Sequence, residues 1–316
     1  MKVKIIKSGK NNLVKKIFFK KKIYIYKKYL KKSNNGIKYS RYSSETAFIK
    51  LLKKKNVKNL PTILNTNAKT QENIFNYIKG KKITKITNKD ILQCVYFIKK
   101  INKDILNNKV VNFKYATEAC LSIDNHIETA QRRIKMLLKF KKNFGIYKKT
   151  TLFVKNVLKK KLDQTKNNIY KSFSKKEILK KINKRDLILS PSDFGFHNII
   201  KKKNKLFFFD FEYAGMDDPV KLISDFICQP DHKLNKNQSL FFYKNILRLL
   251  PKNNDINKRF NAVINLHRIK WCCIILSEIL NKKYYERRKF AGSNINMTKC
   301  LVKAKNYYNQ YLKEIN

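Results

Sequence analysis

Short apolar runs with the length of β-strands occupy the first thirty residues. VKIIKSG (3–9), LVKKIFF (13–19) and KIYIYKKYL (22–30) are rich in β-branched and aromatic residues. GKNN separates the first two runs, and a lysine-rich turn separates the last two. Such runs between turn residues are typical of hairpin strands. The pattern predicts a three-stranded antiparallel meander.

The apolar spacing changes to a helical period after this meander. In SSETAFIKLLKKK (43–55), serine precedes apolar residues three and four apart, which predicts a helix with Glu45 in its first turn. Residues 60–64 and 73–78 are predicted to form two more strands, and Gly80 follows at once. The opening order is therefore three strands, one helix, two strands and a glycine.

Helical periodicity dominates the rest of the chain. The stretches 88–106 and 116–140 both carry apolar residues at helical spacing, and 150–180 predicts another helix or two. Three short strands, LILS (187–190), HNIIKK (197–202) and KLFFFDF (205–211), interrupt the helices. From residue 217 onward the pattern is helical again, and its most apolar part, INLHRIKWCCIILSEIL, is predicted to be buried. We expect an α+β fold with a β-rich N-terminal lobe (1–79), a hinge at Gly80 and a mainly helical C-terminal lobe (80–316).

The composition is that of a globular protein, since 43% of its 316 residues are hydrophobic and 12% aromatic. No apolar run approaches about 18 residues, and the first residues lack the apolar core of a secretory signal, so no transmembrane segment and a cytoplasmic location are expected. The six cysteines form no CxxC pair, which gives no zinc pattern.

The net charge of +53 suggests a nucleic-acid partner at first sight. Lysine supplies most of it and is spread over the whole chain, together with abundant Asn, Ile, Tyr and Phe, all of which have A/T-rich codons. We interpret the charge as a solvated basic surface of a compositionally biased protein and expect no dedicated nucleic-acid site. The charge would still draw anionic ligands toward a cleft.

The candidate chemistry lies in SPSDFGFHN (190–198) and in the Asp that follows LFFF. Asp193 and Asn198 are five residues apart, and Asp210 ends the next hairpin. Carboxylates are costly beside aromatic residues unless a partner offsets their charge. Phosphoryl transfer from ATP needs oxygen ligands for Mg²⁺ and a carboxylate beside the acceptor hydroxyl. One loop and one hairpin end can supply all three groups.

These stretches resemble the aminoglycoside phosphotransferase / choline kinase-like family, which has a protein kinase-like fold. The family's loop reads H-G-D-x-H-x-x-N and is followed by I-D-F/W-E and G-D-P; here FFFDFEYAGMDDP follows the loop. The resemblance implies that Asp193 is the catalytic Asp and that Asn198 and Asp210 bind magnesium. It extends over nearly the whole chain. It implies nucleotide contacts at the turn GKNN with Gly9 and Asn12, at Lys27 and its partner Glu45, and at Tyr77 and Ile78 of the hinge NYIKGK.

The sequence departs from the family pattern in three places. Pro191 replaces the leading His, which is thought to brace the loop. Gly195 stands at the second His, and His197, two places on, is interpreted as a loop-packing residue. The helix Asp is displaced to Asp225, which we expect to brace the catalytic loop by hydrogen bonds.

Two alternatives remain open for the nucleotide lysine. Strand alternation places Lys27 on the face of Ile23 and Ile25, and Lys28 on the other face. Lys27 is preferred, and its pair with Glu45 is expected to be partly exposed and to add little stability.

The function predicted from the sequence is an ATP-dependent kinase for the hydroxyl of a small molecule, with ATP and Mg²⁺. The 21 acids against 74 bases do not indicate a pocket for a cationic acceptor, although two or three local carboxylates would suffice for one. A sugar or cell-surface precursor is preferred as acceptor, by analogy only. Two alternatives are a kinase-shaped ATP-binding protein that has lost transfer, as Pro191 suggests, and a basic nucleic-acid-binding protein.

Overall fold

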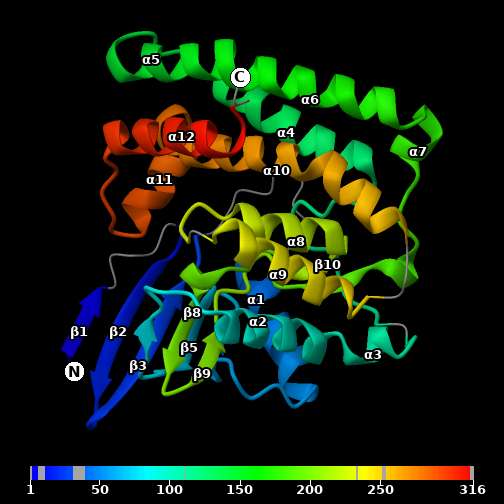
Figure 1. Cartoon of the computed structure of the whole chain (residues 1–316). Coiled ribbons are helices and arrows are strands. Elements are labelled where there is room, and N and C mark those ends of the chain that lie inside the picture. Colours follow the sequence, from blue (N-terminus) through cyan, green and yellow to red (C-terminus); the bar gives the residue numbers. More distant parts are fainter. Residues whose placement is uncertain are drawn as a thin grey trace.

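The first part of the chain folds into a five-stranded antiparallel sheet (Figure 1). The computed structural model describes residues 2–5, 11–30, 40–109, 111–232, 234–250 and 254–313. The strands are β1 (Lys2–Ile5), β2 (Leu13–Phe19), β3 (Lys22–Lys28), β4 (Ile63–Asn67) and β5 (Glu72–Asn76). Their order is β1-β2-β3-β5-β4, so the predicted meander and the two later strands are confirmed.

Helix α1 (Arg41–Lys54) lies between β3 and β4 in the chain. It begins at Ser40, whose hydroxyl accepts a hydrogen bond from the Ser43 backbone N–H at 3.1 Å. This start is earlier than predicted, so Glu45 lies in the second turn instead of the first. Phe48 and Leu52 are fully buried on the same side of the helix as Glu45. The earlier start thus turns Glu45 inward.

Two small sheets follow the first one. Strand β6 (Lys81–Lys82) pairs with β8 (Ile199–Lys202), which pairs with β9 (Lys205–Phe208). Strand β7 (Ile188–Ser190) pairs with β10 (Gly215–Asp217). The predicted strands near 187–190, 197–202 and 205–211 are confirmed. Strands β6 and β10 are too short to leave a period in the sequence.

Helices make up most of the remaining chain. They are α2 (Asn88–Ile101), α3 (Lys103–Leu106), α4 (Ile123–Leu138), α5 (Gly145–Phe153), α6 (Lys159–Ser172), α7 (Lys175–Leu179), α8 (Pro219–Cys228), α9 (Lys236–Leu247), α10 (Asn254–Leu280), α11 (Lys282–Phe290) and α12 (Met297–Tyr311), with a π-turn over Val154–Leu158. Figure 1 shows α8 and α9 between α2 and α10, and α5 and α6 at the edge farthest from the sheet.

One predicted helix begins later than expected. The stretch 116–140 carries a helical period, yet α4 starts only after Ser122, whose hydroxyl accepts from the Asn125 N–H. Before that point the backbone bonds with the chain near β10 instead: Ala116 N–H donates to the Met216 carbonyl at 2.9 Å. Glu118 adopts a positive φ of 61°, which ends any helical continuation.

Stacked phenylalanines form the core beneath the candidate catalytic loop. The rings of Phe97 and Phe208 lie 4.0 Å apart, and Phe194 stacks beside both. A second core lies between α4, α10 and α12 and includes Cys272 and Cys273, so the predicted burial of the most apolar stretch is confirmed. All six cysteines are free.

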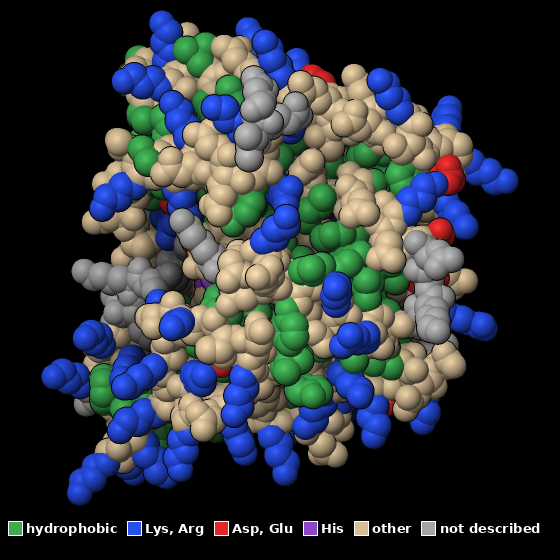
Figure 2. All heavy atoms as spheres, viewed as in Figure 1, with side chains coloured by type: hydrophobic (Ala, Val, Ile, Leu, Met, Phe, Trp, Pro, Cys, Tyr) green, Lys and Arg blue, Asp and Glu red, His purple; other side chains and the backbone are tan. Residues whose placement is uncertain are grey.

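Basic residues are spread over the face of the molecule that Figure 2 shows. Figure 2 shows Lys and Arg side chains at the periphery and across the middle of the face in view, above both the sheet and the helices. Within the described ranges, no helix is apolar over enough length to cross a bilayer.

Candidate active site

Three charged side chains from separate elements meet at the inner face of the sheet. Lys27 on β3 places its Nζ 2.6 Å from Glu45 Oε2 of α1 and 2.6 Å from Asp210 Oδ1 after β9. Its Nζ also lies 4.0 Å from Glu212 Oε2. Lys28 points to the other face, is 41% exposed and contacts Glu72 at 2.9 Å. Of the two lysines, Lys27 is the one that joins Asp210. We call Lys27, Glu45, Asp210 and Glu212 the nucleotide-side cluster.

The ion pair of Lys27 and Glu45 is buried, so the expectation of a partly exposed pair is wrong. Their side chains are 8% and 2% exposed. Tyr29 OH donates to Glu45 Oε2 at 2.5 Å, and the Phe211 N–H donates to Oε1 at 3.2 Å. These two groups close over the carboxylate that α1 turns inward. Burial alone would lower the pKa of Lys27, but the carboxylates of Asp210 and Glu45 raise it well above its usual value.

Asp210 lies two residues beyond β9 in a left-handed conformation with φ of 67°. Aspartate tolerates this region better than most residues. Burial and the like charges of Glu45 and Asp193 raise its pKa, even though Lys27 lowers it. The side chain is still one third exposed. Asp210 is therefore a carboxylate with unbalanced negative charge at an open position.

The loop SPSDFGFHN follows β7 and is anchored by two phenylalanines. Phe194 and Phe196 are both 4% exposed and pack into the core. Asp193, just before Phe194, is half-buried, and Asn198, two residues after Phe196, is buried. The Asn198 amide donates to the Asp193 carbonyl at 2.9 Å. The order of buried and polar residues thus keeps the candidate base and a candidate metal ligand on one side of the loop.

Gln229 and His197 contact the Asp193 carboxylate, in addition to Asn198. Its Oδ1 accepts from Gln229 Nε2 at 3.3 Å and lies 3.2 Å from His197 Nε2. His197 therefore contacts the candidate base, in addition to stacking against His232. We predicted only a packing role for His197. Gln229 was not identified from the sequence.

His232 fixes the loop at the glycine. Its Nδ1 accepts from the Phe196 N–H at 3.3 Å, and its Nε2 donates to the Phe226 carbonyl at 3.1 Å. A Cβ atom on Gly195 would lie 2.6 Å from His232 Cε1, so the ring occupies the space of a side chain there. Burial and the neighbouring His197 lower the pKa of His232 to about 3, which keeps the ring neutral. A bracing histidine is thus present, although position 191 is proline.

Gln229 and His232 left one faint signal in the sequence. Pro230 follows the end of the apolar helix α8. Gln229 comes directly before this proline and His232 two residues after it, and both have hydrogen-bonding side chains. Polar residues at the end of a buried helix often turn toward a site. Their closeness to Asp193 depends on how α8 packs, which the sequence pattern does not specify.

The other predicted nucleotide residues lie apart from Asp193. Asn12 is buried just before β2 and donates to Glu212, two residues beyond Asp210. Gly9 lies outside the described residues. Tyr77 and Ile78 are half-buried after β5, and Lys16 Nζ lies 4.2 Å above the Tyr77 ring. Because Lys27 pairs with Asn73 in β5, Tyr77 and Ile78 lie at the far end of that strand from the nucleotide-side cluster.

A second group of ionisable side chains lies inside the helical part. This helical network consists of His126, Asp217, Asp218, Lys221, Asp225, Arg259, His267 and Lys270. Asp225 contacts Lys270, lies 3.1 Å from His267 Nδ1 and 3.3 Å from Lys221 Nζ. Lys221 Nζ in turn lies 3.5 Å from Ser192 Oγ. Asp225 is thus linked to the loop through Lys221, while α10 presents Lys270 and His267 to its carboxylate; that it braces the loop stays a prediction.

The residues predicted to bind Mg²⁺ have suitable chemistry. The Asn198 amide nitrogen faces Asp193, which leaves its oxygen as the atom able to bind a cation. Asp210 has one oxygen on Lys27 and an excess of negative charge around it. Carboxylate and amide oxygens are the ligands that Mg²⁺ prefers. The donor atoms of Asp210 and Asn198 are therefore of a kind that would suit a magnesium ion.

Comparison with known proteins gives a fold and no sequence relative. No protein-family model matches the chain, and neither does any curated protein. Solved structures match nearly its whole length. A choline kinase from Cryptosporidium parvum Iowa II is 16% identical with a TM-score of 0.53, covering 98% of this chain and 90% of its own.

Two further structures agree. The choline kinase LicA from Streptococcus pneumoniae is 12% identical with a TM-score of 0.58, covering 98% of this chain and 94% of its own. Amicoumacin kinase, solved with AMP-PNP and Ca²⁺, is 11% identical with a TM-score of 0.61, covering 98% of this chain and 88% of its own. The predicted α+β, kinase-like fold is confirmed, with an N-terminal antiparallel sheet and a helical C-terminal part.

Proposed function

We propose that this chain, whose fold is shared with small-molecule kinases, transfers the γ-phosphoryl group of ATP to a hydroxyl of a small molecule. The observation that carries the proposal is the meeting of Lys27, Glu45 and Asp210 from three distant segments, next to a loop that presents Asp193 and Asn198. Phosphoryl transfer depends mainly on positioning and on offsetting charge. Each of these residue types has a use in that reaction.

The proposed roles follow from the contacts. Lys27 would bind the α- and β-phosphates while Glu45 holds its long side chain in place. In the present geometry Lys27 contacts Asp210, so ATP would exchange that contact for phosphate oxygens. Magnesium, when bound, would offset phosphate charge, with Asp210 and Asn198 as its protein ligands.

Asp193 would act as the general base. The acceptor oxygen bonds to the γ-phosphorus, the bond from that phosphorus to the ADP oxygen breaks, and the hydroxyl proton passes to Asp193. Gln229 and His197 hold the Asp193 carboxylate in place for this transfer.

The division of the chain into lobes is part of the proposal. Residues 1–79 would bind the nucleotide, with Tyr77 and Ile78 at its base and Asn12 near its phosphates. Residues 80–316 would supply the catalytic loop and the acceptor site. The Asp210 side chain is one third exposed, whereas the Glu45 side chain is buried. This is expected for a site that receives charged phosphates from one side.

The neighbouring lysines of β3 provide the test. Lys27→Ala should weaken ATP binding and abolish most phosphoryl transfer, whereas Lys28→Ala should leave both unchanged, because Lys28 faces Glu72 on the other side of the sheet. Calorimetric titration with Mg-ATP, together with ADP release in a panel of hydroxyl acceptors, measures both. If Lys28→Ala is the damaging change, the proposed nucleotide site is wrong.

A further inference from the structure

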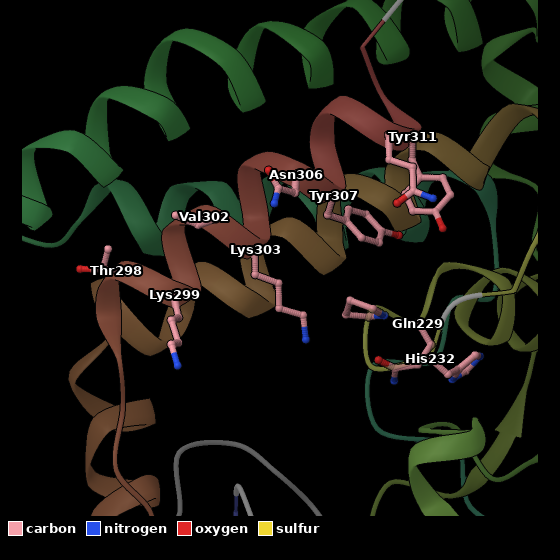
Figure 3. Close-up of a pocket in the computed structure, with 11 residues that line it drawn as sticks. Gln229, His232, Thr298, Lys299, Val302, Lys303, Asn306, Tyr307 and Tyr311 are labelled. Atoms are coloured by element: carbon pink, nitrogen blue, oxygen red, sulfur yellow. The ribbon is translucent and has the colours of Figure 1, made fainter. Parts of the chain in front are cut away.

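A cavity of about 350 Å³ lies between α12 and the loop that follows α8. Most of the residues that line it come from α12, and Gln229, Pro230 and His232 line the opposite side (Figure 3). This volume is at the lower end of the range for small-molecule sites. It suits an acceptor of about the size of a monosaccharide better than one with several rings.

Gln229 connects this cavity to the candidate base. Its Nε2 donates to Asp193 Oδ1 at 3.3 Å, and its Oε1 accepts from the Asp231 N–H at 3.2 Å. Asp231 Oδ1 in turn lies 2.5 Å from Lys303 Nζ on α12. Three successive contacts therefore span the distance from Asp193 to the cavity wall. Gln229 is therefore both a residue of the cavity lining and a contact of the Asp193 carboxylate.

The wall on α12 is basic. Figure 3 shows Lys303 extending from α12 toward the loop with Gln229, and Lys299 extending from the same helix nearer to its start. None of the described residues that line the cavity is acidic. Asp231, beside the cavity, offsets Lys303. Within the described part of the chain, Lys299 has no carboxylate within ion-pair distance.

The far end of the cavity is aromatic. The rings of Tyr307 and Tyr311 lie 4.8 Å apart, and Tyr307 OH donates to the Cys228 carbonyl at 2.6 Å. With its hydroxyl occupied, Tyr307 offers mainly its ring. An aromatic wall beside polar groups is common where proteins bind rings or carbon skeletons with hydroxyls.

We propose that the acceptor is a small hydroxyl compound that also carries an anionic group, a carboxylate or a phosphate. Lys299 binds the anion together with Lys303, Gln229 guides the reacting hydroxyl toward Asp193, and Tyr307 and Tyr311 flank the carbon skeleton. An amine in this cavity would face two ammonium groups with no lining carboxylate, so the same wall excludes cationic acceptors. This inference rests on the proposed kinase function and names its substrate class.

Acceptors of matched size and different charge test the inference. Gluconate and glucose 6-phosphate are the anionic probes, glucose is the neutral one, and glucosamine is the cationic one. Binding to the full chain is measured by calorimetry with AMP-PNP and Mg²⁺ present, and transfer by ADP release. We expect the better anion to bind about tenfold or more tightly than glucose, with glucosamine weakest, and the difference to shrink as salt rises. The two anions distinguish a carboxylate from a phosphate preference.

Variants of α12 complete the test. Lys299→Gln should remove most of the anion preference, so that the better anion binds no more than a few-fold more tightly than glucose, and Lys299→Glu should reverse the preference in favour of glucosamine. Lys305→Gln is the matched control, because Lys305 lies on the same helix and its Nζ is 5.9 Å from the ring of Phe153 on α5. The inference is overturned if glucosamine binds as well as the better anion, if neither anion binds more tightly than glucose, or if Lys299→Gln and Lys305→Gln behave alike. Mg-ATP binding that depends on Lys27 would still support the kinase function in those cases, so the two failures are distinguishable.

Discussion

Two groups of buried charges lie on either side of the candidate catalytic loop, and they differ in balance. In the nucleotide-side cluster, Lys27 faces the carboxylates of Glu45, Asp210 and Glu212, and a second cation, Arg41, lies 3.9 Å from Glu212 alone. In the helical network, three carboxylates meet Lys221, Lys270 and Arg259, with two histidines between them. The first group is short of positive charge and open at Asp210. The second is compensated and closed.

The pKa values of Asp210 and Asp225 express the same contrast, although burial also raises the pKa of Asp217 within the helical network. Burial and like charges raise the pKa of Asp210, whereas Lys270 and Lys221 hold the pKa of Asp225 well below its usual value despite burial. A carboxylate whose ionised form is stabilised by neighbouring cations needs no further ligand. A carboxylate whose ionised form is destabilised is stabilised when a cation binds to it. Buried charge alone therefore does not identify a site. The deficit of positive charge at an accessible position does.

The largest effect is expected at the loop between the two groups. Asp193→Asn keeps the shape of the side chain and removes the base, so transfer should fall by about 10²–10⁴ while Mg-ATP affinity stays the same. Asp163→Asn, on the exposed side of α6, is the control. Single-turnover ADP formation with a working acceptor measures the loss. An unchanged rate in Asp193→Asn would remove this residue from the mechanism.

A pair of alanine substitutions tests the comparison itself. Asp225→Ala leaves Lys270 and Lys221 buried without their shared partner and should cost about 3–5 kcal/mol of unfolding free energy. Asp210→Ala relieves the excess negative charge and should change that free energy little, but it should weaken Mg-ATP binding more than binding of metal-free ATP.

Urea denaturation and nucleotide titrations with and without Mg²⁺ measure the two effects. If both variants lose the same stability, the two groups of charges do not differ as described. Equal affinity losses with and without the metal would mean that Asp210 has only a structural role.

The smallest effect concerns the histidines of the helical network. Burial alone would lower the pKa of His126, but Cys120 and Asp218 raise it to about 9. Because this exceeds the ordinary 6.5, protonated His126 stabilises the fold fully below pH 6.5, and the contribution disappears as pH rises to about 9. Burial and Lys270 lower the pKa of His267 to about 3. Because the unfolded chain takes up this proton more readily, His267 lowers the free energy of unfolding as the pH falls below 6.5.

His126→Gln should therefore cost most stability near pH 6 and little at pH 9. Unfolding free energies of the parent and the variant, measured across that range, give the difference. A difference that stays constant with pH would show that His126 is neutral in the folded chain.

Much of the fold could be predicted because local patterns are strong where strands are half-buried. Alternation in β3 separates Lys27 from Lys28, and the residue spacing around Asp193 and Asn198 defines the loop. The start of α1 was missed because Ser40 competes with Ser43 and Ser44 as a cap. That error led to the wrong prediction that Glu45 is partly exposed. Gln229 and His232 could not be assigned, because their positions depend on contacts between helices far apart in the sequence.

Strand β10 joins three distant parts of the chain. It pairs with β7 on one side, and Met216 exchanges backbone hydrogen bonds with the segment around Tyr115 on the other. At Gly215 a Cβ atom would lie 2.3 Å from the Ala116 nitrogen, so the two backbones touch. The chain thus leaves this strand near residue 117 and returns to it at residue 188, after α4 to α7. This strand therefore fixes both ends of the helical segment α4 to α7 beside the candidate catalytic loop, while buried residues such as Val154, Leu158 and Leu162 hold its middle against α4 and α10.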